Sequence, residues 1–318
     1  MNATIGGLVA ARIATSLLIL LLVSLIVFAA TLALPGDFAQ ELLGQSATPE
    51  MVKAVRQSMG TDLPPHERYF AWLSGLVRGD PGVSLVNQLP VAEQIGKRLP
   101  NSLLLAGLTA MVAVPVALFI GITAAMHQGS RYDRLVNLMT VSLVSVPEFL
   151  VATIAVLILA VNLKWLPALS QVSDGQPFLQ VARSLLLPVL TLTSIVIAQM
   201  ARLTRAAIVN TLRAPYIEMA ILKGASPARV VLTHALPNTI GPVANAVALS
   251  LSSLLGGVVV VETIFNYPGL ARLMVDAVST RDIPIVQACA MIFCAGYLLL
   301  VTIADVLAIL SNPRLRHH

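Results

Sequence analysis

Long runs of apolar residues without a single charge constrain this chain more than any other feature of its sequence. Residues 13–34 and 99–126 contain no Asp, Glu, Lys or Arg. A helix needs about 20 apolar residues to cross the hydrocarbon core of a bilayer, so each run predicts a membrane-spanning helix. Charged residues make up 11% of the chain, against about 25% in soluble domains. This difference argues against both a disordered chain and a soluble enzyme.

Six such stretches predict an all-α, polytopic membrane protein that forms a single domain over residues 1–318. The first stretch is too long for a secretory signal peptide and is followed by no clear cleavage site, so we expect it to be retained. The third stretch is interrupted by Glu148. The expected spans cover residues 9–31, 102–124, 136–160, 184–203, 240–262 and 285–307.

The basic residues between the spans predict the orientation of the chain. With the N-terminus inside, the inside segments contain ten Lys or Arg residues, and their only acids are Asp133 and Glu218. The outside segments also contain ten, but six of these lie in one long loop, 35–98, and long loops carry little weight in the positive-inside rule. We therefore predict a membrane protein with both termini in the cytoplasm. The net charge of +5 is then a topology signal rather than a nucleic-acid-binding surface.

Two connections between the predicted spans are unusually long. The outer one, 35–98, contains two candidate short helices at 49–59 and 65–77, and Pro and Gly residues punctuate it. We expect it to form a small ordered cap. The inner one, 204–239, is predicted to lie in the cytoplasm.

The inner connection has the pattern of a helix–turn–helix at 216–227. Glu218 lies near the start of the first helix, where the helix dipole favours an anion, and Lys223 lies in its last turn, where a cation is favoured. Gly224 stands where a C-cap glycine belongs, and Ser226 can cap a second helix. Spacing alone leaves open an amphipathic helix that rests on the membrane surface, with Ile217, Ala220 and Ile221 as its apolar side.

This segment resembles the cytoplasmic signature of permease subunits of ABC importers, which is Glu-Ala-Ala, three residues, Gly, nine residues, Ile, one residue and Leu-Pro. The residues that match at this spacing are Glu218, Ala220, Gly224, Leu236 and Pro237. Two positions depart from the signature. Met219 replaces an alanine and puts a larger side chain on the side of the helix that, by the resemblance, docks on an ATPase subunit. His234 replaces the isoleucine. Further segments resemble the dipeptide, oligopeptide and nickel branch of the family, namely 34–37, 98–102, 201–205, 234–238, 262–270 and 312–316.

The resemblance implies a type I ABC importer permease fold, a place in the bacterial inner membrane and a set of partners. These are a second homologous permease, two ATPase subunits that bind ATP and Mg, and an extracytoplasmic protein that delivers the solute. The outer loop 35–98 is expected to contact the binding protein or the other permease. The residues implied in coupling to an ATPase are Glu218, Met219, Ala220, Lys223, Gly224, Leu236 and Pro237.

The solute class implied by the resemblance is a dipeptide or oligopeptide. Nickel, glutathione and opine- or sugar-type solutes stay open, because in such importers the binding protein usually selects the solute. The chain has no nucleotide-binding loop of its own, since Gly96-Lys97 is followed by Arg98 and is preceded by Val91 where the first glycine should stand. We therefore expect no enzymatic activity and no catalytic residue in this chain.

Other transporter and enzyme classes fit the sequence less well. A self-sufficient secondary transporter predicts duplicated halves, and an intramembrane enzyme needs a nucleophile and base or a metal pair in its spans. The sequence shows no such duplication, and among candidate groups inside the spans only Glu148 stands out. His66, His127 and His234 are scattered over different loops, so no metal site is expected.

Glu148 is the ionisable residue with the clearest functional alternatives. A carboxylate within a span is costly unless it faces protein or water. Glu148 either meets a cationic part of the solute along the pathway, or forms a hydrogen bond beside the carbonyl freed by Pro147.

The remaining charged groups near the span ends have simpler expectations. Glu262 and Tyr267, at the outer end of the fifth span, are predicted to lie near an outer gate. Asp305 is expected to pair with Arg314 or Arg316, or with an arginine of the fourth span. Arg202 and Arg205, which end that span, are expected to anchor it at the interface.

Overall fold

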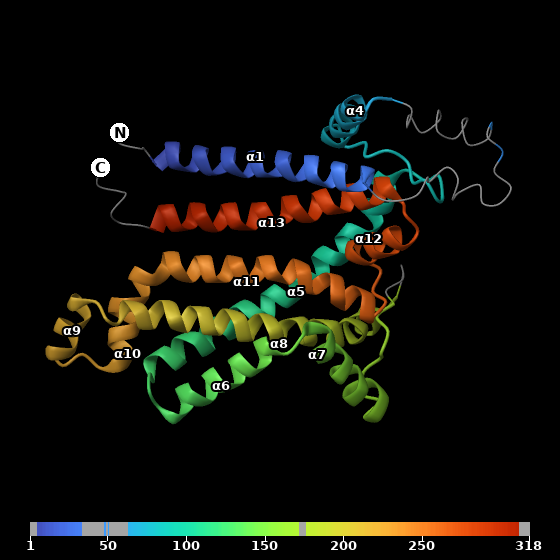
Figure 1. Cartoon of the computed structure of the whole chain (residues 1–318). Coiled ribbons are helices and arrows are strands. Elements are labelled where there is room, and N and C mark those ends of the chain that lie inside the picture. The colour runs from blue at the N-terminus through green and yellow to red at the C-terminus, as the bar shows by residue number, and fades with distance from the viewer. Residues whose placement is uncertain (1–4, 34–47, 49, 51–62, 172–175, 312–318) are drawn as a thin grey trace. The chain divides into compact units, whose positions relative to one another are not determined.

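The described part of the chain is helical. The computed structural model describes residues 5–33, 48, 50, 63–171 and 176–311 (Figure 1). Within these ranges the backbone forms helices and one isolated bridge between Val83 and Pro90, which confirms the all-α prediction. The predicted helix at 49–59, the segments 34–37 and 312–316, and the arginines at 314 and 316 lie outside the described residues.

Five helical segments in these ranges are long and apolar enough to cross a membrane, and a bent pair of helices gives a possible sixth span. The pair consists of α6 (Arg131–Ser145) and α7 (Glu148–Ala155), which continues as the π-helix η2 (Val156–Asn162). The five are α1 (Ile5–Leu32), α5 (Val91–Met126), α8 (Phe178–Thr211), α13 (Ile283–Ser311) and one continuous run of α10 (Pro227–Arg229), the π-helix η3 (Val230–Ala235) and α11 (Leu236–Ile264).

The third predicted span, 136–160, is not one straight helix. α6 and α7 meet at an angle of 99°, and the break falls at Val146 and Pro147. Val146 has an extended backbone, with φ −86° and ψ 129°, because a residue before proline is sterically excluded from the helical region. Glu148 therefore lies in the first turn of a new helix, directly after the break.

The described residues group into two compact units. The first unit comprises Met1–Ser16, Ser102–Pro268 and Tyr297–His318, and the second comprises Leu17–Asn101 and Gly269–Gly296. The long helices α1, α5 and α13 each contribute one part to either unit.

In the first unit, α8 packs along α11 on one side and against α6 on the other (Figure 1). Small residues let the helices approach closely, as is usual in membrane helix packing. A methyl group at Gly121 of α5 would lie 2.8 Å from the Ala201 carbonyl oxygen and from Thr204 Cβ, both on α8. Some buried hydroxyls on these helices donate to their own backbone, for example Thr191 Oγ1 to the Leu187 oxygen at 2.9 Å.

The second unit contains α4 (Pro65–Val77) and α12 (Leu270–Ser279), so the predicted helix at 65–77 is confirmed. α4 packs its aromatic side on α1: the Phe28 ring lies 5.4 Å from Tyr69 and 5.8 Å from Trp72, centroid to centroid. The Ser24 and Tyr69 hydroxyls are hydrogen-bonded at 2.8 Å. A separate apolar core joins α12 to α5 and α13 through Val91, Ile95, Leu270, Ala277, Ile285, Ala288 and Cys289.

Candidate functional site

The predicted signature helix is present as α9 (Pro215–Leu222), which lies between α8 and α10 at one end of the first unit (Figure 1). Proline occupies its first turn, where the missing N–H has no intrahelical partner to lose. Ala214 before it is extended, with φ −74° and ψ 143°. Glu218 lies in the first turn, so the predicted start of this helix is confirmed.

α9 ends at the glycine that the sequence predicted as its cap. Gly224 has φ +83°, a left-handed conformation that disfavours any residue with a Cβ. The Gly224 N–H donates to the Ile221 oxygen at 2.9 Å, and the Ala225 N–H donates to the Ala220 oxygen at 3.2 Å. These two bonds form a Schellman motif, in which Lys223 is the C-cap residue.

The second helix of the predicted helix–turn–helix continues into the fifth span. Ser226 Oγ accepts from the Arg229 N–H at 3.4 Å and so caps α10, as predicted. From Pro227 the backbone stays helical to Ile264. Leu236 and Pro237 therefore lie in the first turn of α11, directly after the π-helical η3. A π-turn at this place accommodates a proline inside a helical run, because that proline cannot donate to the regular ladder.

The helices on both sides extend into the connection predicted at 204–239. α8 continues to Thr211, and the next helical run begins at Pro227. Hydropathy marks where a helix leaves the apolar layer, whereas the helix itself ends where its hydrogen bonds end. Arg202 and Arg205 stop the apolar run without stopping α8.

α9 is anchored through one side chain and exposes most of the others. Ile217 is fully buried in an apolar core with Ala125, Ile208, Val209, Val230, Val231 and Ala235. The predicted apolar side is therefore divided, because Ala220 is half-buried and Ile221 is exposed. Large apolar side chains face outward from the rest of the helix: Leu222 is 74% exposed, Met219 and Ile221 are each 56% exposed, and Tyr216 is 46% exposed.

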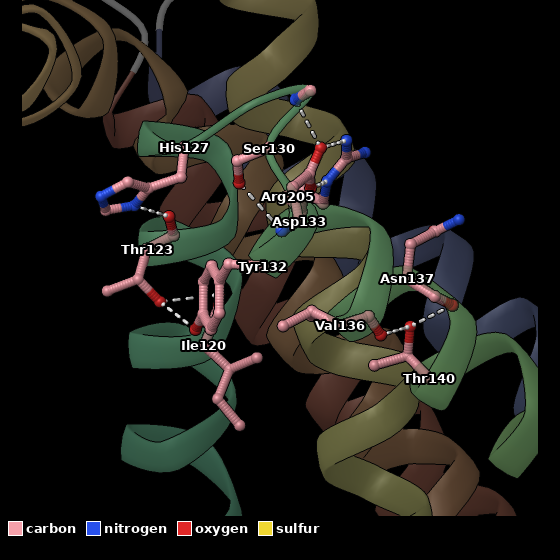
Figure 2. A network of polar contacts seen from close by, with 11 residues as sticks. Ile120, Thr123, His127, Ser130, Tyr132, Asp133, Val136, Asn137, Thr140 and Arg205 are labelled. Carbon is pink, nitrogen blue, oxygen red and sulfur yellow. Dashed lines mark hydrogen bonds and ion pairs between the residues drawn. The ribbon is translucent and has the colours of Figure 1, made fainter.

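A buried ion pair lies next to this core and fixes α6 to α8 (Figure 2). Arg205 donates to both carboxylate oxygens of Asp133, from Nε to Oδ1 and from Nη2 to Oδ2, the latter at 2.7 Å. Asp133 is only 3% exposed and also accepts from the Gly129 N–H at 2.9 Å. Arg205 is therefore committed to a contact inside the protein, which corrects the expectation that it anchors the span at the interface.

The turn between α5 and α6 is closed by further polar contacts (Figure 2). Ser130 Oγ accepts from the Asp133 N–H at 3.2 Å and caps α6. The Thr123 and Tyr132 hydroxyls are hydrogen-bonded at 2.9 Å, and His127 Nδ1 contacts the Thr123 oxygen at 2.9 Å. The sequence offered one sign of this network, since Asp133 is one of two acids in otherwise basic segments. It did not indicate that the partner of Asp133 is Arg205, 72 residues further along the chain.

Glu148 does not form the hydrogen bond expected beside Pro147. The Leu143 carbonyl, which a proline would leave free, accepts from the Val146 N–H at 3.3 Å. The Glu148 carboxylate instead faces Gly257 of α11, where an added methyl group would lie 3.0 Å from Glu148 Oε2. Among the described residues we find no hydrogen bond or ion pair from this carboxylate. It lines a small recess with Leu192, Ile195, Val196, Ser253, Leu254 and Gly257.

Glu262 and Tyr267 are buried within the first unit. Ser102 Oγ donates to Glu262 Oε1 at 2.5 Å, and Glu262 is fully buried. α11 ends in a second Schellman motif, with Asn266 at φ +50° and the Tyr267 N–H donating to the Glu262 oxygen at 2.9 Å. Burial and the neighbouring Glu262 raise the pKa of the Tyr267 phenol. These residues pack the end of α11 and brace it against α5.

Asp305 pairs with a residue that the sequence analysis did not consider. Its Oδ2 lies 3.4 Å from Arg12 Nη1, which corrects the expected pairing with the fourth span. Among the described residues we find no cluster of three or more His, Cys, Asp or Glu side chains that could hold a metal ion.

Comparison with known proteins identifies the family. The model for binding-protein-dependent transport system inner membrane components matches residues 117–317, and the model for their N-terminal part matches residues 7–106. The glutathione transport system permease protein GsiC of Escherichia coli is 38% identical over 299 residues, which cover 94% of this chain and 95% of that protein. The probable peptide ABC transporter permease protein y4tP of Sinorhizobium fredii is 32% identical over 312 residues, covering 98% and 100% of the two chains.

These matches extend over nearly the whole chain and agree with the helical architecture. They confirm the family resemblance found in the sequence, including its peptide-transporting branch. The chain is therefore a multi-pass inner-membrane protein of an import system that works with ATPase and binding-protein partners. It belongs to the binding-protein-dependent transport system inner membrane components, the permease subunits of ABC importers.

Proposed function

We propose that this permease moves small peptides, or a peptide-like solute such as glutathione, across the inner membrane by alternating access. The relatives named for glutathione and peptide transport support this solute class. Nickel chelates and opine- or sugar-type solutes are the alternatives, since selection would lie with the binding protein. The proposed orientation places both termini and α9 in the cytoplasm, in line with the basic residues of those segments.

The observation that carries the proposal is the exposed apolar surface of α9. Met219, Leu222 and Ile221 are more than half exposed although they lie beside charged residues rather than inside an apolar span. Exposed apolar side chains gathered on one short element favour a protein partner. We propose that this surface docks on an ATPase subunit, with Glu218, Ala220, Lys223 and Gly224 shaping the helix and its end.

The connections of α9 suit the transmission of force. Three residues, 212–214, join it to α8, and four residues, 223–226, join it to α10. α8 and α11 pack along each other, so displacement of α9 would move both helices together. Rigid helices that shift as bodies are a common device in alternating transport. A second homologous permease would complete the pathway, and ATP and Mg would be bound by the two ATPase subunits.

The charged groups within the spans have different places in this proposal. Glu148, which faces a recess and has no partner among the described residues, is our candidate for contact with a cationic group of the solute. Glu262 and Tyr267 are buried, and we propose that they hold the outer end of α11 in position as part of the gate region. They would affect transport by fixing the position of the α11 backbone rather than by contacting the solute.

Docking can be tested by placing a charge on the exposed surface of α9. In the assembled transporter, Met219→Glu and Leu222→Glu should release the ATPase subunits or uncouple ATP hydrolysis from uptake, because each buries a carboxylate in an apolar contact. Both side chains are exposed, so the folding of the chain should be unaffected. Phe70→Glu on α4, also exposed at 65%, is a matched control that should leave ATPase binding intact. Retained ATPase binding and coupled uptake in both α9 variants would refute the docking proposal.

A further inference from the structure

A second site lies at the end of α8 opposite to α9. There the first unit has an open cavity of about 400 Å³, a size typical of pockets that hold small molecules. The transport mechanism proposed above does not use this cavity. Its lining residues come from the end of η2, the following turn and the first turns of α8: Ala160, Lys164, Leu166, Pro167, Ala168, Gln180, Arg183 and Ser184.

The turn after η2 fixes the cavity's cationic side. Lys164 has φ +54°, a conformation that is unusual for a residue with a long side chain. Backbone bonds hold the turn on both sides of Lys164: the Leu163 N–H donates to the Ile158 oxygen and the Trp165 N–H to the Leu159 oxygen, each at 2.9 Å. These bonds keep Lys164 at the rim of the cavity.

Arg183 supplies the second cation from α8. Its Nη2 donates to the Trp165 oxygen at 3.0 Å, so one N–H holds the turn while a guanidinium retains further donors for a ligand. None of the described lining residues is acidic. We also find no ion pair to Lys164 or Arg183 in the described part of the chain. Two cations at the positive end of a long helix favour an anionic ligand.

The surroundings of the cavity indicate which anion it meets. Large apolar side chains next to it are strongly exposed: Phe178 at 86%, Leu179 at 80%, Trp165 at 64% and Leu169 at 51%. Tryptophan is enriched at the headgroup level of membranes, and basic side chains at the ends of spans extend into that layer. A soluble anion would make no favourable contact with these apolar side chains. A phospholipid carries a phosphate for the two cations and acyl chains for the apolar side chains beside them.

We propose that this cavity binds the phosphate headgroup of an anionic phospholipid, with Lys164 and Arg183 as its ligands and with the acyl chains against Trp165 and Phe178. Gln180 and Ser184 offer additional polar groups to the headgroup. Basic pockets between membrane helices bind anionic headgroups in this way. In the proposed orientation the lipid belongs to the outer leaflet.

The test compares lipids retained by the purified transporter complex in native mass spectrometry. The wild type should retain phosphatidylglycerol in preference to phosphatidylcholine. The double variant Lys164→Gln with Arg183→Gln should lose about twentyfold to thirtyfold in apparent affinity for phosphatidylglycerol, as expected for two basic residues near the surface. The control Arg131→Gln with Arg213→Gln removes two charges at the opposite end of the spans and should keep the lipid. Equal retention of phosphatidylglycerol by both double variants would overturn the proposal.

A second measurement on the wild type keeps the proposal testable if the double variant does not assemble. A photoreactive phosphatidylglycerol should label peptides that contain residues 160–168 and 178–184, and phosphatidylglycerol should compete while inorganic phosphate should not. Labelling confined to other helices would overturn the lipid site. Displacement by inorganic phosphate would show a soluble anion site instead. A carboxyl-to-amine crosslink from Lys164 to a partner protein would show that a protein carboxylate fills the cavity.

Discussion

Removing the Arg205 side chain should loosen the contact between α6 and α8 next to the core that holds α9. In Arg205→Ala, both carboxylate oxygens of Asp133 lose a charged donor. The Asp133 carboxylate would stay buried, at 3% exposure, with the Gly129 N–H at 2.9 Å as a remaining donor.

The loss in the free energy of unfolding can be estimated from these contacts. Breaking a buried ion pair by removing one partner costs about 3–5 kcal/mol, because the other charge is left without its counterion. We expect the lower end, about 3 kcal/mol, since the Gly129 N–H remains and the Arg205 side chain is 23% exposed. A loss of 1 kcal/mol lowers the unfolding midpoint of a domain of about 150–250 residues by about 2–4 °C. The variant should therefore unfold about 6–12 °C below the wild type.

Thermal unfolding of the purified complex in detergent measures this shift, and Arg202→Ala provides the matched control. Arg202 lies one turn away on α8 and has no hydrogen bond or ion pair among the described residues, so its loss should cost less than about 1 kcal/mol. Asp133→Ala with Arg205→Ala should be less destabilised than the sum of the two single variants. Equal midpoints for Arg205→Ala and Arg202→Ala would refute the reasoning.

Three further substitutions test the local geometry. Gly121→Ala should destabilise the chain by about 1–3 kcal/mol through overpacking against α8, whereas Gly107→Ala on the same helix, with nothing within 4 Å of an added methyl, should be neutral or stabilising in the same thermal assay. Gly224→Ala should cost about 1–2 kcal/mol by straining the end of α9 and should lower the ratio of uptake to ATP hydrolysis; an unchanged ratio would contradict the role of this turn. Ser102→Ala should cost about 1–3 kcal/mol because it removes a donor from the buried Glu262, and Ser102→Thr should restore most of it; failure of the threonine to do so would show that the hydroxyl is not the cause.

The sequence predicted best those features that depend on neighbouring residues. The start of α9 at Pro215, its end at Gly224 and the cap at Ser226 each follow from the preferences of one or two side chains. The apolar runs likewise marked where most of the long helices lie, because hydropathy is a local property. The break before Pro147 had its signal in the sequence, but an apolar run that passes through a proline can be either a kinked span or two separate helices.

Contacts between distant parts of the chain could not be read from one sequence. Asp133 and Arg205 lie 72 residues apart, and the expected partners of Asp305 did not include Arg12. Any of several arginines could satisfy a buried carboxylate, so charge alone does not choose among them. The extension of α8 beyond its apolar run was missed for a related reason. Its last two turns are held by backbone bonds and by the core around Ile217, neither of which hydropathy reports.

The two short connections of α9 restrict the rigid-body degrees of freedom of this helix. A docking helix attached by flexible loops could rotate in the groove of its partner, and part of the partner's movement would then not reach the membrane helices. Here three residues join α9 to α8, and four residues, closed by the Schellman turn at Gly224, join it to α10, which continues into α11. α8 and α11 pack along each other. Rotation of α9 about its own axis would have to extract Ile217 from its buried site. If α9 docks on an ATPase as proposed, what is left is joint displacement with the ends of α8 and α10, so this chain would set the direction of the movement and the partner its size.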